Sequence, residues 1–157
     1  MRIITGKYKG RHFDIPRTFK ARPTTDFAKE NIFNVINAYV DWEEATALDL
    51  FAGTGSISLE LLSRGCRQVI SVEKDHDHAR FISQKDRDHA RFIAQCMEKI
   101  GADEHVLIKG DVFRFIKSCH QQFDFIFADP PYALPELPTI PDLIFSQDLL
   151  APDGLFV

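Results

Sequence analysis

The spacing of hydrophobic residues along this 157-residue chain alternates between that of buried strands and that of helices. From Ala45 onward, short apolar runs that fit buried strands alternate with segments whose apolar residues recur at helical spacing. Strands are predicted at 47–51, 68–72, 105–108, 123–128 and from 155, and helices at 56–64, 75–100, 112–119 and 141–149. This alternation is typical of a doubly wound parallel sheet, so we expect an α/β fold.

The first 40 residues follow a different pattern. Segments 1–5 and 11–15 are strand-like and are joined through 6–10, which predicts a β-hairpin that Pro16 ends. The loop 22–26 carries Thr and Asp side chains suited to capping a helix. One face of that helix is apolar, and we expect it to belong to the core: Ala28, Ile32, Val35, Ile36 and Tyr39.

A tandem duplication interrupts the regular pattern. Residues 74–84 (KDHDHARFISQ) and 85–95 (KDRDHARFIAQ) agree at all but two positions. Eleven residues make about three helical turns, so an added copy either extends one helix with the same apolar face or loops out of it. The histidines of the two copies, His76, His78 and His89, suggest a metal site only weakly, because no cysteine or second cluster accompanies them, and we expect none.

Composition limits the class of protein. The length suits one domain with one core, and no apolar run approaches the roughly 18 residues that cross a membrane. The N-terminus lacks the apolar segment of a secretion signal. Three widely spaced cysteines fit neither a disulfide framework nor a zinc site, which favours a reducing, cytoplasmic location.

Charge is unevenly distributed. Net charge is −4, yet residues 1–30 hold eight Lys/Arg against three Asp/Glu, a local +5, while the rest holds eleven against twenty, or −9. A basic arm on an acidic body would steer a polyanion to one end of the molecule, although a solvated basic hairpin explains the charge equally well.

Acidic residues end three successive predicted strands. Asp49 precedes a glycine turn at Gly53 and Gly55, Glu73 ends the second strand, and Asp111 follows the third. Ser58 replaces the third glycine of the dinucleotide fingerprint, which disfavours a pyrophosphate cradle. A glycine turn with three acids describes instead a pocket for a nucleoside without phosphates, and S-adenosylmethionine fits it.

The fourth predicted strand runs directly into Asp129, Pro130, Pro131 and Tyr132. Proline cannot continue a sheet ladder and restricts the residue before it to an extended backbone. Asp129 is therefore held at a strand end with an aromatic ring nearby, an arrangement suited to a planar group that carries hydrogen-bond donors. The alternative is a proline-rich strand exit without chemistry.

These motifs resemble a known family. Residues 49–55 (DLFAGTG) resemble the first motif of class I S-adenosylmethionine-dependent methyltransferases, and 129–132 (DPPY) that of enzymes acting on exocyclic amino nitrogens. Segments 2–11 (RIITGKYKGR) and 22–26 (RPTTD) are similar to the bacterial 16S ribosomal RNA guanine-N2 methyltransferases, the D type of small-subunit methyltransferase. The resemblance covers nearly the whole chain and departs from the family in the duplicated segment and the C-terminus.

The resemblance implies a Rossmann-like fold and a role for each matching residue. Asp49, Gly53 and Gly55 would line the methionine portion of the cofactor, Glu73 would bind the ribose and Asp111 the adenine, and Phe51 would be a further cofactor-binding residue. Asp129, Pro130 and Tyr132 would be catalytic, and Lys7, Lys9, Arg11, Arg22 and Thr24 would contact RNA. The implied partner is 16S ribosomal RNA, in the small ribosomal subunit, with the protein acting as a monomer away from membranes.

Two further expectations concern organisation. Residues 1–40 would form an RNA-facing hairpin and helix, and 41–157 the cofactor-binding domain, together one globular unit. The chain ends within the fifth strand, where the family adds further strands, so we expect a C-terminally truncated sheet.

Two other functions stay open. An adenine-N6 methyltransferase uses similar Asp-Pro-Pro-Tyr chemistry, but those acting on DNA usually need a separate target-recognition domain. The other alternative is a cofactor- or RNA-binding fragment without catalytic activity.

Overall fold

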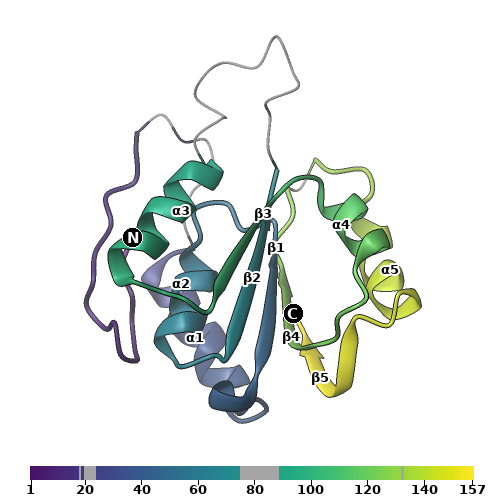
Figure 1. Ribbon diagram of the computed structural model, residues 1–157, viewed down its shortest axis with the longest axis horizontal. Helices are drawn as coiled ribbons and strands as arrows, with labels where there is room; N and C mark the ends of the chain where they lie inside the picture. The colour runs from purple at the N-terminus through teal and green to yellow at the C-terminus, as the bar shows by residue number, and fades with distance from the viewer. Residues whose placement is uncertain (18, 20–23, 75–88, 132) are drawn as a thin grey trace.

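A computed structural model describes residues 1–17, 19, 24–74, 89–131 and 133–157 (Figure 1). Five parallel strands form one sheet in the order β3-β2-β1-β4-β5, which confirms the predicted α/β fold. The strands are β1 (Thr46–Leu50), β2 (Gln68–Glu73), β3 (His105–Lys109), β4 (Phe123–Ala128) and β5 (Leu150–Phe156). The α-helices are α1 (Asp26–Ile36), α2 (Ser56–Ser63), α3 (His89–Ile100), α4 (Val112–Ser118) and α5 (Ile140–Ser146), with 3-10 turns η1 (Trp42–Glu44) and η3 (Leu137–Thr139).

The helices cover both faces of the sheet, with α1, α2 and α3 on one side and α4 and α5 on the other (Figure 1). Side chains alternate along each strand, so Ala47 packs in the cluster under α1–α3 while Leu48 and Leu50 pack under α4 and α5. The sheet therefore has an apolar core on each of its faces. A strand buried on both faces carries a continuous apolar run, and this is why such runs predicted the strands.

The strand order reverses between β1 and β4. From β1 the chain moves outward to β2 and β3, and then returns to place β4 on the other side of β1. Leu50 pairs with Ala128, so the two strands end level with each other. In open α/β sheets such a reversal leaves a crevice at the carboxyl ends of the strands, which is where ligands bind.

The N-terminal hairpin is less regular than predicted. Its two segments run antiparallel through a single bridge between Arg2 and His12, supported by backbone hydrogen bonds such as Ile3 N to Arg11 O, 3.0 Å. The hairpin packs on α2 rather than extending the sheet. Lys7 N donates to Ser63 O (2.8 Å), so a backbone hydrogen bond to α2 holds the hairpin in addition to its own short pairing.

The predicted core face of α1 is partly wrong. Thr25 caps the helix as expected, its hydroxyl accepting from Ala28 N, but the buried residues are Lys29, Phe33 and Ile36. Of the predicted residues, Ile36 is buried and Ile32 is partly buried against the core, whereas Val35 and Tyr39 are exposed; all four line an apolar groove of about 450 Å³ beside β5. Lys29 occupies the core position because a buried carboxylate on α2 faces it, a contact that helical spacing cannot reveal.

Residues 89–95 of the second copy of the duplicated segment lie in α3. In α3, Phe92 and Ile93 are buried, and they belong to residues 85–95. The first copy lies almost entirely within 75–88, outside the described residues, as do His76 and His78. The predicted helix 75–100 is thus observed over its second half.

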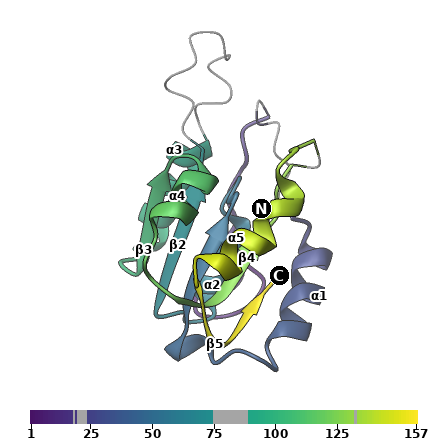
Figure 2. The ribbon, with the colours of Figure 1, turned by 90° about the vertical axis from the view of Figure 1, so that its right-hand side faces the viewer.

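The last strand starts earlier than predicted. Leu150 already pairs with Phe123, and the register shifts before Phe125 pairs with Leu155. The segment 152–154 expected to lead into the strand is a bulge inside it, where Asp153 has a φ of 63°. Strand β5 forms one edge of the sheet and runs beside α1 (Figure 2). Across the described part of the chain, no helix has the length and apolarity needed to span a membrane.

Candidate functional site

The turn after β1 is built from left-handed backbone. Phe51 and Gly53 both have a φ of 58°, and Gly55 has a φ of 80° at the N-cap of α2. A Cβ at Gly55 would lie 3.1 Å from Ile93 Cγ1 in α3, so glycine serves both the turn and the close approach of the helix. Phe51 carries a side chain in a conformation that L-residues rarely adopt. The chain thereby leaves the sheet sharply at its carboxyl edge.

Glu73 at the end of β2 bonds to this turn. Its Oε2 accepts from Gly53 N at 2.6 Å, which fixes the carboxylate against the glycine backbone. Its Oε1 lies 3.7 Å from His89 Nδ1, the first residue of α3. The structure therefore brings together Gly53, Gly55 and Glu73, as predicted from their positions after successive strands.

Asp49 lies beneath the turn and is buried. Its Oδ2 accepts from Ser58 Oγ at 2.6 Å. Burial raises the pKa of Asp49 to about 7; the Ser58 hydrogen bond lowers it, and the nearby carboxylates Glu73 and Asp129 raise it further. The carboxyl edge of the sheet thus concentrates negative charge, which a cationic ligand would relieve.

Asp111 is engaged in a second role. Its carboxylate caps α4 by accepting from Arg114 N at 3.0 Å. The residue before it, Gly110, donates its N–H to Glu73 O at 2.8 Å, which holds the end of β3 against the end of β2. Asp111 therefore stands at the same edge as Glu73, with one carboxylate oxygen used by the helix cap.

Asp129 and Pro130 follow β4 at this edge. Because Leu50 and Ala128 are register partners, Asp129 leaves the sheet beside Phe51. Asp129 is exposed and Pro130 is partly exposed, so both are accessible from solvent. Tyr132 lies outside the described residues.

The structure separates the basic residues of the hairpin from the carboxylates. Helix α2 starts at the glycine turn and runs about 12 Å to Ser63, whose carbonyl holds Lys7 N. The hairpin tip therefore lies toward the amino ends of the strands. Lys7, Lys9 and Arg11 are exposed there, with Arg11 Nη2 donating to Lys99 O (3.1 Å) at the end of α3. Thr24 lies just before the α1 cap, and Arg22 is outside the described residues.

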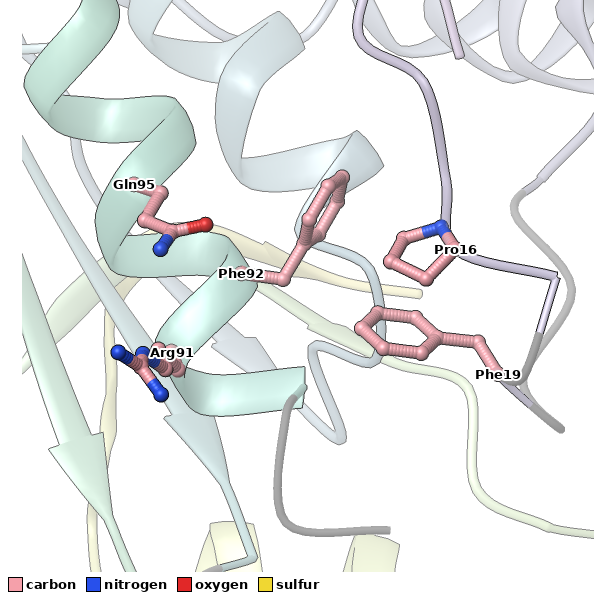
Figure 3. A pocket seen from close by; sticks show the side chains of 5 residues that line it. All are labelled: Pro16, Phe19, Arg91, Phe92 and Gln95. Carbon is pink, nitrogen blue, oxygen red and sulfur yellow. The ribbon is translucent and has the colours of Figure 1, made fainter. Parts of the chain in front are cut away.

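Sequence reasoning missed His89 as a neighbour of the site. Its Nε2 is buried without a hydrogen-bond partner among the described residues, and its ring packs against Phe19 with centroids 4.4 Å apart. Phe19 also lines a cavity of about 190 Å³ with Pro16 and three residues of α3: Arg91, Phe92 and Gln95 (Figure 3). Figure 3 shows Pro16 and Phe19 on one side of this cavity, with Phe92 across from them. The segment after the hairpin thus reaches the neighbourhood of Glu73.

Sequence reasoning also missed Ser71 and His105. Both join a hydrogen-bonded chain that starts at Asp49. The usable signal was a polar residue within an apolar strand, since Ser71 lies between Ile70 and Val72 just as Asp49 lies between Leu48 and Leu50.

The carboxylates at this edge suit S-adenosylmethionine better than a phosphate-bearing ligand. Asp49 and Glu73 lie at the glycine turn, and Glu73 and Asp129 raise the pKa of Asp49 by like-charge repulsion. Such a site attracts ammonium and sulfonium cations and accepts hydrogen bonds from hydroxyl groups. Within the described ranges, no cluster of three or more His, Cys, Asp or Glu could hold a metal ion.

The sheet order and the glycine turn at its reversal are those of a Rossmann-like fold. The fold is similar to that of a putative methyltransferase from Escherichia coli, with a TM-score of 0.82 and 24% identity over 99% of this chain and 77% of that one. A Thermus thermophilus protein gives a TM-score of 0.81 at 24% identity, covering 99% of this chain and 83% of the other.

The chain belongs to the family described as "Conserved hypothetical protein 95", which matches residues 1–157. A putative rRNA methyltransferase of Bacillus subtilis is 32% identical over 100% of this chain and 80% of its own length. The ribosomal RNA small subunit methyltransferase D of Haemophilus influenzae is 30% identical, over 99% of this chain and 76% of its own. The predicted family resemblance is confirmed.

Proposed function

We propose that this protein transfers a methyl group from S-adenosylmethionine to the exocyclic N2 amine of a guanine in 16S ribosomal RNA. The observation that carries the proposal is the position of Asp129 and Pro130. They leave β4 beside the glycine turn of β1, at the reversal of strand order. A cofactor on the turn and a base held by Asp129 would therefore meet in one crevice.

The residues around the turn would hold the cofactor. Asp49 supplies negative charge beneath the glycines. Glu73 Oε2 is held by Gly53 N, and its Oε1, which lies 3.7 Å from His89 Nδ1, would accept from a ribose hydroxyl. Asp111 stands at the neighbouring strand end, at the position assigned to the adenine. When bound, S-adenosylmethionine supplies a methyl group activated by a sulfonium centre.

Asp129 and Pro130 would hold the acceptor amine. The lone pair of a guanine N2 is delocalised into the ring, which makes it a poor nucleophile. Asp129 accepting one N–H and the Pro130 carbonyl accepting the other would favour a tetrahedral nitrogen whose lone pair points at the methyl group. Fixing the geometry in this way lowers the barrier, and Asp129 can take the departing proton.

The target base would have to leave its stack, and Tyr132 is the proposed stacking surface for it. Contacts to the RNA backbone would come from Lys7, Lys9, Arg11, Arg22 and Thr24. Because the hairpin tip lies at the far end of α2, its lysines would contact phosphates well away from the target and set position without reading sequence. Relatives with names of ribosomal RNA methyltransferases support the substrate class.

The test is transfer of labelled methyl groups from S-adenosylmethionine. The wild-type protein is incubated with small ribosomal subunits lacking the modification, with naked 16S RNA and with DNA. We expect label in guanine N2 of the RNA. Asp129→Ala should lower the rate at least about 100-fold while cofactor affinity, measured by calorimetry, changes little.

The matched control is Asp142→Ala, which removes an exposed carboxylate from the first turn of α5 and should leave the rate unchanged. Label in adenine of DNA would replace the proposal with an adenine-N6 methyltransferase. Absence of cofactor binding by the wild type would favour a fragment without catalytic activity.

A further inference from the structure

Four polar side chains form a continuous chain across the sheet face under α2. Asp49 Oδ2 lies 2.6 Å from Ser58 Oγ, Ser58 Oγ lies 2.6 Å from Ser71 Oγ, and Ser71 Oγ lies 2.7 Å from His105 Nε2. Strands β1, β2 and β3 and helix α2 contribute one residue each. Asp49, Ser58 and Ser71 are fully buried, so each depends on the next for its hydrogen bonds.

The direction of this chain is set as a whole, because each serine hydroxyl carries one proton. When Asp49 is ionised, Ser58 donates to it, so Ser71 donates to Ser58 and must itself receive the Nε2–H of His105. When Asp49 is protonated on the oxygen that faces Ser58, every donor and acceptor can reverse, and His105 Nε2 then accepts from Ser71. The tautomer of His105 is thereby tied to the protonation state of Asp49.

We propose that Ser58, Ser71 and His105 are positioning residues for Asp49, forming a relay that favours its ionised state and reverses direction when it is protonated. The functional part of the inference rests on the proposed function, in which Asp49 attracts the cationic methionine portion of the cofactor. The relay would then tune how tightly the cofactor binds at a given pH without touching it.

The charges around the relay define the pH window. Burial raises the pKa of Asp49 to about 7, and the charged groups that act on it from neighbouring strand ends, Glu73 and Asp129, are both carboxylates. Burial lowers the pKa of His105 to about 4. Between pH 5.5 and 9 the ring of His105 therefore stays neutral, and within the relay only Asp49 changes charge.

The first test is nitrogen-15 NMR of histidine side chains, on the full chain without cofactor. The His105 resonance is identified by its loss in His105→Gln. We expect His105 to change from the Nδ1–H to the Nε2–H tautomer as pH rises from 5.5 to 9. In Ser71→Ala, which interrupts the relay, and in Asp49→Asn, which does not titrate, the tautomer should stay constant.

The second test is the affinity for S-adenosylmethionine as a function of pH. Ser58→Ala removes a hydrogen bond to the charged carboxylate. If the pKa of Asp49 then rises by about one unit, the ionised fraction at pH 7 falls from about one half to about one tenth. Affinity should fall about fivefold at pH 7 and stay nearly equal to wild type at pH 9. A merely structural defect would lower affinity equally at both pH values.

The donor requirement is tested separately at the end of the relay. His105→Gln keeps an N–H donor for Ser71 and should retain the wild-type pH profile more closely than His105→Leu, which has none. A His105 tautomer that stays the same at all pH values, or that changes in Ser71→Ala as it does in wild type, would overturn the relay. A wild type that shows the tautomer change but binds no cofactor would overturn the proposed function and leave the relay intact.

Discussion

The two ends of α2 each hold a buried carboxylate, and their surroundings differ. Toward its C-terminal end, Glu60 Oε2 accepts from Ile4 N (2.9 Å) and Oε1 from Thr5 N (3.0 Å). Arg64 Nε lies 3.1 Å from Oε1, and Lys29 Nζ lies 3.6 Å from Oε2. Lys29 also donates to Arg2 O at 2.6 Å. Glu60 therefore has two cations and two backbone donors, and these bonds fasten the N-terminal hairpin to the helix.

At the N-terminal end of α2, the carboxylate of Asp49 receives hydrogen bonds from the hydroxyl and the backbone of Ser58, and two further carboxylates raise its pKa. Burial without a cation is unfavourable for an ionised group. The comparison separates two uses of a buried acid. Glu60 is paired with cations of the chain and stabilises the fold, while among the described residues no cation acts on Asp49, at an edge where a cationic ligand would pair with it.

The largest expected effect is at the compensated end. Glu60→Gln leaves Lys29 buried without its counter-charge, and breaking a buried pair in this way lowers the free energy of unfolding by about 3–5 kcal/mol. Urea denaturation at pH 7 measures the change. The control is Glu98→Gln on the exposed face of α3, with an expected change below about 0.5 kcal/mol. A loss of under about 1 kcal/mol for Glu60→Gln would contradict the comparison.

At Asp49, removing the charge should raise the free energy of unfolding rather than lower it. The pKa of Asp49 is raised from its usual 3.8 to about 7, so its protonated form is favoured in the folded protein. Its contribution is fully present below about pH 4 and is lost as pH rises toward 7. Because asparagine does not ionise, the Asp49→Asn variant keeps this stability at high pH. In the absence of cofactor, its free energy of unfolding at pH 8 should exceed that of the wild type by about 2–4 kcal/mol.

Denaturation of wild type and Asp49→Asn at a series of pH values checks the sign. The two stability curves should separate between pH 4 and 7 and run parallel above that. Parallel curves across the whole range would mean that Asp49 is already compensated in the free protein, as Glu60 is.

A smaller effect tests the attachment of the hairpin. Gly6 and Gly10 both have positive φ, 95° and 83°, but a Cβ at residue 6 would overlap the Ser63 carbonyl while one at residue 10 meets nothing within 4 Å. Gly10→Ala should cost about 1 kcal/mol from backbone strain alone, and Gly6→Ala about 2 kcal/mol more. Thermal unfolding of the two variants isolates the contact with Ser63. Equal losses would show that the hairpin is not held there.

The alternation of strand and helix was predictable because each element repeats its own hydrophobic period locally. The positions of Glu73, Asp111 and Asp129 at strand ends followed from the same pattern, while Asp49 lies inside β1, one residue before its end. The core face of α1 did not, because the ammonium group of Lys29 is buried against partners outside the helix: Glu60, 31 positions further along the chain, Ser56 and the carbonyl of Arg2. The bulge in β5 was also missed, since Pro152 and Gly154 are typical of turns outside strands.

The sequence by itself determined a parallel α/β sheet with a glycine turn and four acids at the carboxyl ends of its strands, because periodicity and strand-ending residues act over a few neighbours. Only the tertiary structure decided that Glu60 is paired with cations and that Asp49 belongs to a relay with Ser71 and His105. It also decided that the basic hairpin tip lies at the opposite end of α2. Those outcomes depend on contacts between segments that are far apart in the sequence, and the pattern of a few neighbouring residues carries no information about such contacts.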